Sequence, residues 1–158
     1  MFLAFFSETF FEVLLLILSV TIIIVVGSIF FIRDLRKDFK QVFKMRSKFH
    51  IEIRKIVNLI FNIFNSDLLE PFTKVVIKKL PHEQKKILLK NIDIVYSQLD
   101  VNDPINMYIV ETYENLQKLR RERDARILTY HHKLNTFPYS IYANIMKLPK
   151  YELYTESE

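Results

Sequence analysis

Apolar residues run without interruption through one stretch near the start of the chain. Residues 13–32, VLLLILSVTIIIVVGSIFFI, contain no charged side chain. As a helix, these 20 residues rise about 30 Å, which matches the hydrocarbon thickness of a bilayer. The pattern predicts one transmembrane helix over residues 13–32, preceded by a short N-terminal segment of residues 1–12.

A cleaved signal peptide is the alternative interpretation of this run. Signal peptides begin with basic residues, hold a shorter apolar core and end at a cleavage site of small residues. Residues 1–12 instead carry Glu8 and Glu12 without a Lys or Arg, and no such cleavage site follows the run. We therefore expect an uncleaved anchor.

Beyond residue 32, apolar residues recur every three or four positions, the spacing that places them on one face of a helix. Neither proline nor glycine interrupts residues 33–65, so we expect one long helix that continues directly from the apolar run. Asn65, Ser66 and Asp67 predict the turn after it. The stripe of this helix consists of Leu35, Phe39, Val42, Met45, Phe49, Ile53, Ile56, Ile60 and Phe64.

Two shorter segments follow the first turn. Residues 72–80 are predicted to form a short segment with Phe72, Val76 and Leu80 on one face. Pro81 suits the first turn of a new helix, where its missing N–H costs nothing. The stripe of that helix consists of Leu88, Ile92, Val95 and Leu99.

A last long helix is predicted from Pro104 to Thr136, with Asp103 as its N-cap. The apolar spacing fails near position 123, where residues 120–126 read RRERDAR. Such a run is typical of a solvated face with pairs such as Glu122–Arg126, and a basic patch for an acidic partner is the alternative. The apolar stripe consists of Ile105, Ile109, Thr112, Leu116, Leu119, Ile127, Tyr130, Leu134 and Phe137.

The pattern as a whole predicts an all-α fold, in which an N-terminal transmembrane helix is followed by an antiparallel bundle of long helices. Residues 33–138 form the predicted bundle domain, and residues 139–158 form a short helix and a tail. Pro138 disfavours helical backbone at Phe137, so we expect Phe137 to end the last helix and its ring to close the apolar seam. The short helix then covers the end of the bundle or touches lipid.

Charge is distributed unevenly around the apolar run. Residues 1–32 hold two acidic residues and no basic one, whereas residues 33–58 hold nine basic and three acidic residues. The positive-inside rule places the N-terminus outside the cell membrane and the bundle in the cytoplasm. These basic residues are also suited to anionic lipid headgroups, and because they lie beside the span we expect no nucleic acid as a partner. The nearest ones are Arg33, Arg36, Lys37, Lys40 and Lys44.

Composition and spacing argue against most kinds of catalytic chemistry. The chain has one glycine and no cysteine, which excludes glycine-rich phosphate loops and thiolate sites. His131 and His132 are adjacent and point about 100° apart on a helix, whereas two helical metal ligands normally lie four residues apart. A di-iron carboxylate bundle needs Glu-x-x-His pairs on two helices, and the sequence contains no such pair. We predict no catalytic residue, cofactor or metal.

The C-terminal region resembles that of the LemA family. The resemblance rests on a Tyr-x-x-Lys-Leu-x-Thr-Phe-Pro pattern followed by an alanine, and on the apolar positions upstream of it. It covers about residues 105–146 and implies an antiparallel helical bundle on a membrane anchor, without an established enzyme activity. The residues that carry it are Ile105, Ile109, Thr112, Leu116, Arg120, Tyr130, Lys133, Leu134, Thr136, Phe137, Pro138, Ile141 and Ala143.

Three functions are compatible with these features. The first is a membrane-anchored interaction or scaffold module that binds an unknown protein partner or forms a homo-oligomer. The second is a membrane-perturbing or pore-associated helical effector, which the phenylalanine-rich residues 1–12 and the basic helix beside the span suggest; a conducting oligomer would distinguish it. An enzyme acting at the membrane ranks last, because no acid–base pair can be named.

Overall fold

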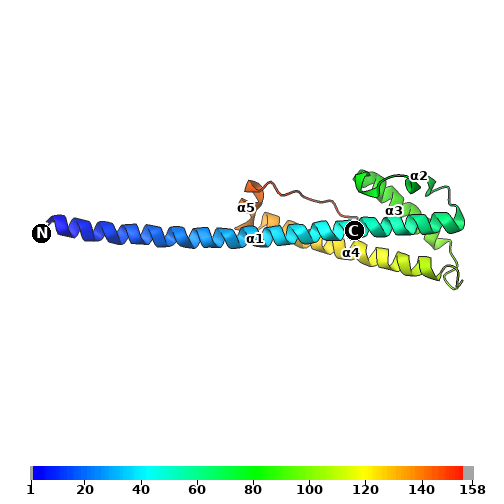
Figure 1. Ribbon diagram of the computed structural model, residues 1–158, viewed down its shortest axis with the longest axis horizontal. Helices are drawn as coiled ribbons and strands as arrows, with labels where there is room; N and C mark the ends of the chain where they lie inside the picture. The colour runs from blue at the N-terminus through cyan, green and yellow to red at the C-terminus, as the bar shows by residue number, and fades with distance from the viewer. Residues whose placement is uncertain (1, 155–158) are drawn as a thin grey trace. The chain divides into compact units, whose positions relative to one another are not determined.

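A computed structural model describes the backbone of residues 2–154 and the side chains of residues 10–154. Within this part of the chain every regular element is a helix, so the predicted all-α fold is confirmed (Figure 1). The elements are α1 (Phe2–Phe64), α2 (Glu70–Thr73), a 3-10 helix η1 (Ile77–Lys79), α3 (His82–Ser97), α4 (Met107–Asn135) and α5 (Tyr139–Ile145).

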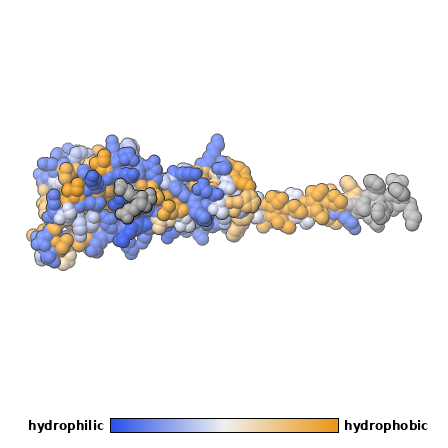
Figure 2. All heavy atoms as spheres, turned by 180° about the vertical axis from the view of Figure 1, so that it is seen from behind, coloured by the Kyte–Doolittle hydropathy of each residue, from blue (hydrophilic) through white to orange (hydrophobic). Residues whose placement is uncertain are grey.

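Helix α1 contains the apolar run and continues without a break into the first amphipathic stripe, as the sequence predicts. It is long and apolar enough to cross a membrane: its most apolar window has a mean hydropathy of 3.0, and none of that window is buried. Figure 2 shows this bare apolar stretch in orange. The hydroxyl groups of Ser19 and Thr21 donate hydrogen bonds to carbonyls of the preceding turn, so they leave no unsatisfied donor on the apolar surface.

The chain divides into two compact units. Unit 1 combines Met1–Asp38 with His132–Leu148, and unit 2 combines Phe39–His131 with Pro149–Glu158. Each unit therefore joins a part of α1 to a segment near the end of the chain.

In unit 2, α4 runs antiparallel to α1. The Arg126 guanidinium donates a 2.9 Å hydrogen bond to the Gln41 side chain, while the Lys55 ammonium lies 4.7 Å from the centre of the Tyr108 ring. Contacts therefore join later residues of α1 to earlier residues of α4. This register confirms the antiparallel packing of the long helices.

Residues 65–81 return along the last part of α1, and α3 then runs in the same direction as α1 (Figure 1). The Arg54 guanidinium fixes this return by donating to the backbone carbonyls of Phe72, Thr73 and Val75. The predicted common face of residues 72–80 does not form. The segment is split between α2 and η1, and Val76 between them is exposed.

The core of unit 2 is built from the predicted stripes. Helix α3 packs antiparallel to α4, with the Tyr96 and Tyr113 rings stacked 3.6 Å apart. A buried cluster takes side chains from α1, α3, α4 and the return segment, together with Tyr154 near the end of the described chain. Its aliphatic members from α1 and α3 are Ile53, Ile56, Val57, Ile60, Leu88, Leu89, Ile92 and Val95.

Helix α4 is shorter at both ends than predicted, and two stripe residues lie outside the packed seam. The Asp103 carboxylate accepts a hydrogen bond from the Ile105 N–H, which forms a turn before the helix starts and leaves Ile105 70% exposed. At the other end the helix stops at Asn135, two residues before Phe137, which is 77% exposed. The expectation that the Phe137 ring closes the seam is therefore wrong; Leu134 is the last buried residue of α4.

Candidate functional site

A buried ion pair lies in the middle of α4, where the sequence predicted a solvated face. Arg123 and Asp124 are only 3% and 2% exposed and form an ion pair with each other. A buried ion pair is tolerated when further hydrogen bonds satisfy its remaining polar atoms. The segment that ends at Tyr154 supplies them: the Arg123 guanidinium donates to the Glu152 carbonyl at 2.7 Å, and the Asp124 carboxylate accepts from the Tyr154 N–H at 2.9 Å.

Tyr154 is the aromatic anchor of this segment. Its ring lies 4.2 Å from the Arg123 guanidinium, stacks on His82 at 4.6 Å and contacts Phe49 at 5.3 Å. The Arg120 guanidinium donates to the Tyr154 carbonyl. Tyr154 is thus held through its ring and through both of its backbone polar groups.

The residues before Tyr154 are held by their backbone as well. The Tyr130 hydroxyl donates to the Pro149 carbonyl at 3.2 Å, and the His131 Nε2 accepts from the Tyr151 N–H at 3.0 Å. The Arg46 guanidinium lies 4.4 Å from the centre of the Tyr151 ring. Residues 149–154 lie outside any helix, so their backbone polar groups need other partners, and side chains of α4 supply them. We call residues 149–154 the tail, and we call Arg120, Arg123, Asp124, Tyr130 and His131 the tail clamp.

Burial governs the electrostatics of the tail clamp. It lowers the pKa of Arg123, against the opposing effect of the Asp124 carboxylate. Burial, aided by the Lys150 charge, also lowers the pKa of His131, which favours the neutral imidazole that accepts from the tail. Burial raises the pKa of the Tyr154 hydroxyl. Both shifts favour the uncharged forms of His131 and Tyr154, which suits the binding of a peptide backbone.

A second cluster lies in unit 1, at the end of the apolar run. The Lys133 ammonium binds the Asp34 carboxylate at 2.8 Å and the Asp38 carboxylate at 2.6 Å, and the Tyr139 hydroxyl donates to Asp34 at 3.0 Å. Burial alone would lower the pKa of Lys133, but the hydrogen bonds to Asp34 and Asp38 outweigh it and raise that pKa. The Lys133 hydrogen bond in turn lowers the pKa of Asp34.

Aromatic contacts join α5 to the same part of α1. The Phe31 ring meets Tyr139 edge-on at 5.1 Å and stacks on Tyr142 at 5.7 Å. The Tyr142 hydroxyl also lies 2.7 Å from the Ser28 hydroxyl. Because Ser28 and Phe31 belong to the last turns of the predicted span, these contacts fix α5 at its end.

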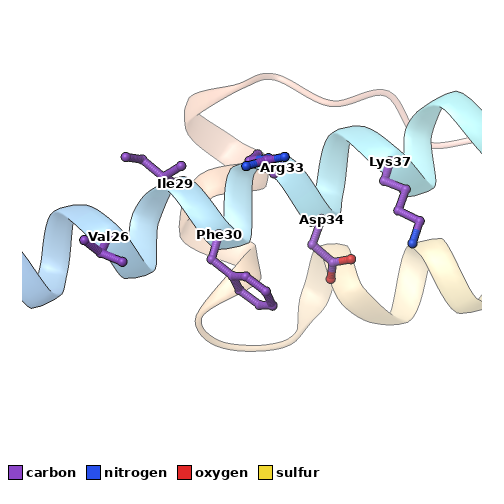
Figure 3. A pocket seen from close by; sticks show the side chains of 6 residues that line it. All are labelled: Val26, Ile29, Phe30, Arg33, Asp34 and Lys37. Atoms are coloured by element: carbon purple, nitrogen blue, oxygen red, sulfur yellow. The ribbon is translucent and has the colours of Figure 1, made fainter.

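A shallow groove of about 630 Å³ lies on α1 at this level (Figure 3). Apolar side chains line its first part and charged ones its second, so the lining changes from apolar to charged over about three helical turns. The five predicted flanking basic residues are all exposed, and Arg33 and Lys37 are the two that line this groove. The lining consists of Val26, Ile29, Phe30, Arg33, Asp34 and Lys37.

The family-motif residues fall into three groups. Ile109, Thr112, Leu116, Tyr130, Leu134 and Ala143 are buried, whereas Ile105, Phe137, Ile141 and Thr136 are exposed. Arg120 belongs to the tail clamp, Lys133 belongs to the ion-pair cluster of unit 1, and Pro138 is the N-cap of α5. The contacts of Arg123, Asp124 and Tyr154 were not predicted from the sequence. The one sequence feature that marks this part of the site is the missing apolar residue near position 123.

Among the side chains that the structure describes, no group of three His, Asp or Glu residues is placed to hold a metal ion. The arrangement binds polypeptide backbone in unit 2 and joins ionic and aromatic groups to the end of the apolar run in unit 1. The chain matches no protein-family description, no curated protein and no solved structure.

Proposed function

We propose that the protein is a single-pass membrane protein whose helical bundle is a non-catalytic interaction or scaffold module at the cytoplasmic face. The observation that carries this proposal is the apolar window of α1, which holds no buried residue and continues without a break into packed amphipathic helix. Apolar surface of this extent in water favours aggregation, whereas a bilayer removes it from water. The exposed Arg33, Arg36 and Lys37 directly after the span support the orientation.

The proposal includes membership of the LemA type. This membership is supported by the motif residues between Tyr130 and Ala143, on which the resemblance rests. The family's lack of an established enzyme activity agrees with a scaffold. The partner is a protein that the cytoplasmic bundle holds at the membrane, or a second copy of the chain.

Labelling of single cysteines tests insertion and orientation together. The natural sequence has no cysteine, so Ser7→Cys and Asn115→Cys each introduce a unique thiol on either side of the span. In intact cells we expect a membrane-impermeant maleimide to label Ser7→Cys alone, and both variants after permeabilisation. Labelling of Asn115→Cys in intact cells would contradict the orientation, and extraction of the protein by alkaline carbonate would contradict the span.

Crosslinking then tests the scaffold. A photoreactive crosslinker attached at Asn115→Cys should give a discrete adduct in native membranes, which mass spectrometry identifies as a partner protein or a second copy. Absence of any adduct, together with channel conductance of the purified protein in planar bilayers, would favour the pore-associated alternative.

A further inference from the structure

The short helix α5 and Phe137, two residues before it, expose large apolar side chains. Phe137, Ile141 and Ile145 are 77%, 49% and 73% exposed. Ile141 and Ile145 are four residues apart and so share one face of α5. Tyr142 and the buried Ala143 occupy other positions of the same helix, and Tyr142 contacts α1. In α5, therefore, Tyr142 packs against α1, whereas the aliphatic side chains of Ile141 and Ile145 are exposed.

The attachment of α5 fixes its level along α1. The Tyr142 hydroxyl meets the Ser28 hydroxyl, and the Tyr142 ring stacks on Phe31, in the last turns of residues 13–32. Figure 1 shows α5 (orange) beside α1 in this region. When residues 13–32 cross a bilayer, Ser28 and Phe31 lie near its cytoplasmic boundary. The outward residues of α5 then lie at the depth where hydrocarbon meets headgroups.

We propose that Phe137 and α5 form a second, interfacial membrane contact, in which Phe137, Ile141 and Ile145 insert into the cytoplasmic leaflet of the bilayer that α1 crosses. This inference rests on the proposed membrane insertion of α1. Interfacial helices of this kind bury an apolar face at the boundary of headgroups and acyl chains, and tyrosines such as Tyr139 and Tyr142 favour the same depth.

A lipid surface fits this face better than a protein partner does. Tyr139 and Tyr142 attach α5 directly to the last turns of the span, so the same bilayer covers the span and the exposed face of α5. Arg33 and Lys37 follow the span on α1, Lys147 follows α5, and all three are exposed basic residues that suit anionic headgroups. The Lys133 ion pairs with Asp34 and Asp38 hold the start of this segment against α1, so α5 is positioned before it meets lipid.

Single tryptophans report the depth directly, because the natural sequence contains no tryptophan. The full-length variants Phe137→Trp and Ile145→Trp are reconstituted into vesicles of phosphatidylcholine and phosphatidylglycerol that carry bromine at shallow or deep acyl positions. Two exposed positions provide matched controls: Ile23→Trp within the span and Leu128→Trp in unit 2. Circular dichroism checks that each variant keeps its helix content.

We expect shallow bromines to reduce the fluorescence of Phe137→Trp and Ile145→Trp by about twofold or more, as for other interfacial side chains. Deep bromines should quench Ile23→Trp most, and Leu128→Trp should stay unquenched.

Quenching of Ile23→Trp without quenching of Phe137→Trp and Ile145→Trp would overturn the interfacial contact alone, and self-association of the protein would then assign this face to a second copy. Absence of quenching at Ile23→Trp would overturn the membrane insertion itself. Quenching of Leu128→Trp equal to that of Ile145→Trp would overturn a specific role for α5.

Discussion

The carboxylate of Asp124 accepts a 2.9 Å hydrogen bond from the backbone N–H of Tyr154, 30 residues further along the chain. A buried carboxylate in the middle of a helix is costly unless such donors satisfy it. The tail is therefore part of the fold of unit 2, and its removal would expose the core as well as the ion pair.

Replacement of Tyr154 by alanine should destabilise unit 2 by about 3 kcal/mol, because a buried aromatic ring is removed and leaves a cavity beside Phe49 and His82. Chemical unfolding in detergent micelles, followed by circular dichroism, measures this loss. Leu128→Ala is the matched control, since Leu128 is exposed and should change the free energy of unfolding little. Equal stability of the Tyr154 variant and the natural protein would contradict an anchoring role.

The Arg123–Asp124 pair should behave as one unit in a double-mutant cycle. Asp124→Leu leaves the Arg123 charge buried without its partner, and Arg123→Met does the reverse, so each should cost about 3 kcal/mol. The double variant should lose clearly less than the sum of the two single losses, because it leaves neither charge behind. Additive losses in the same unfolding experiment would show that the two side chains act independently.

The stability of unit 2 should fall between neutral pH and pH 4. Burial, reinforced by the charges of Lys85 and Arg46, lowers the pKa of His50 from 6.5 to about 4. Between these two pKa values the unfolded chain binds a proton that the folded chain does not, so stability is full above pH 6.5 and is lost as the pH falls. Free energies of unfolding at pH 7 and pH 5 measure the effect.

The variant His50→Gln removes this titration, so its loss of stability between pH 7 and pH 5 should be smaller than that of the natural protein. Leu128→Ala is the control, because Leu128 is exposed and cannot bind a proton. An identical pH dependence in the His50 variant and the natural protein would refute the assignment.

Periodicity predicted most of the helical architecture because burial of one face dominates helix packing. The stripe from Leu35 to Ile60 is buried at most of its positions, and the helix ends within one residue of the predicted turn. The ends of α4 were harder to predict. Local hydrogen bonds decide them, such as that between Asp103 and the Ile105 N–H, and the apolar character of Ile105 and Phe137 carries no information about these bonds.

The tail clamp could not be predicted from the local sequence. A run such as RRERDAR is normally solvated, and only the approach of a segment 30 residues away turns Asp124 into a buried acceptor. The break in the apolar stripe near position 123 marks the place without revealing the partner. The ion pairs of unit 1 could not be predicted for the same reason, since Lys133 and Asp34 are 99 residues apart in the sequence.

The position of α5 on α1 should depend on Lys133. Replacement by methionine leaves the carboxylates of Asp34 and Asp38 facing each other without their shared cation, which removes two charged hydrogen bonds and adds repulsion. Such bonds contribute about 1.5–3 kcal/mol, so the backbone amides of α5 should exchange hydrogen about tenfold to a hundredfold faster in detergent micelles. Lys133→Arg should restore much of the protection, and Lys118→Met, at an exposed position of the same helix, should leave it unchanged. Exchange of α5 at the natural rate in Lys133→Met would mean that the aromatic contacts with Phe31 hold the helix alone.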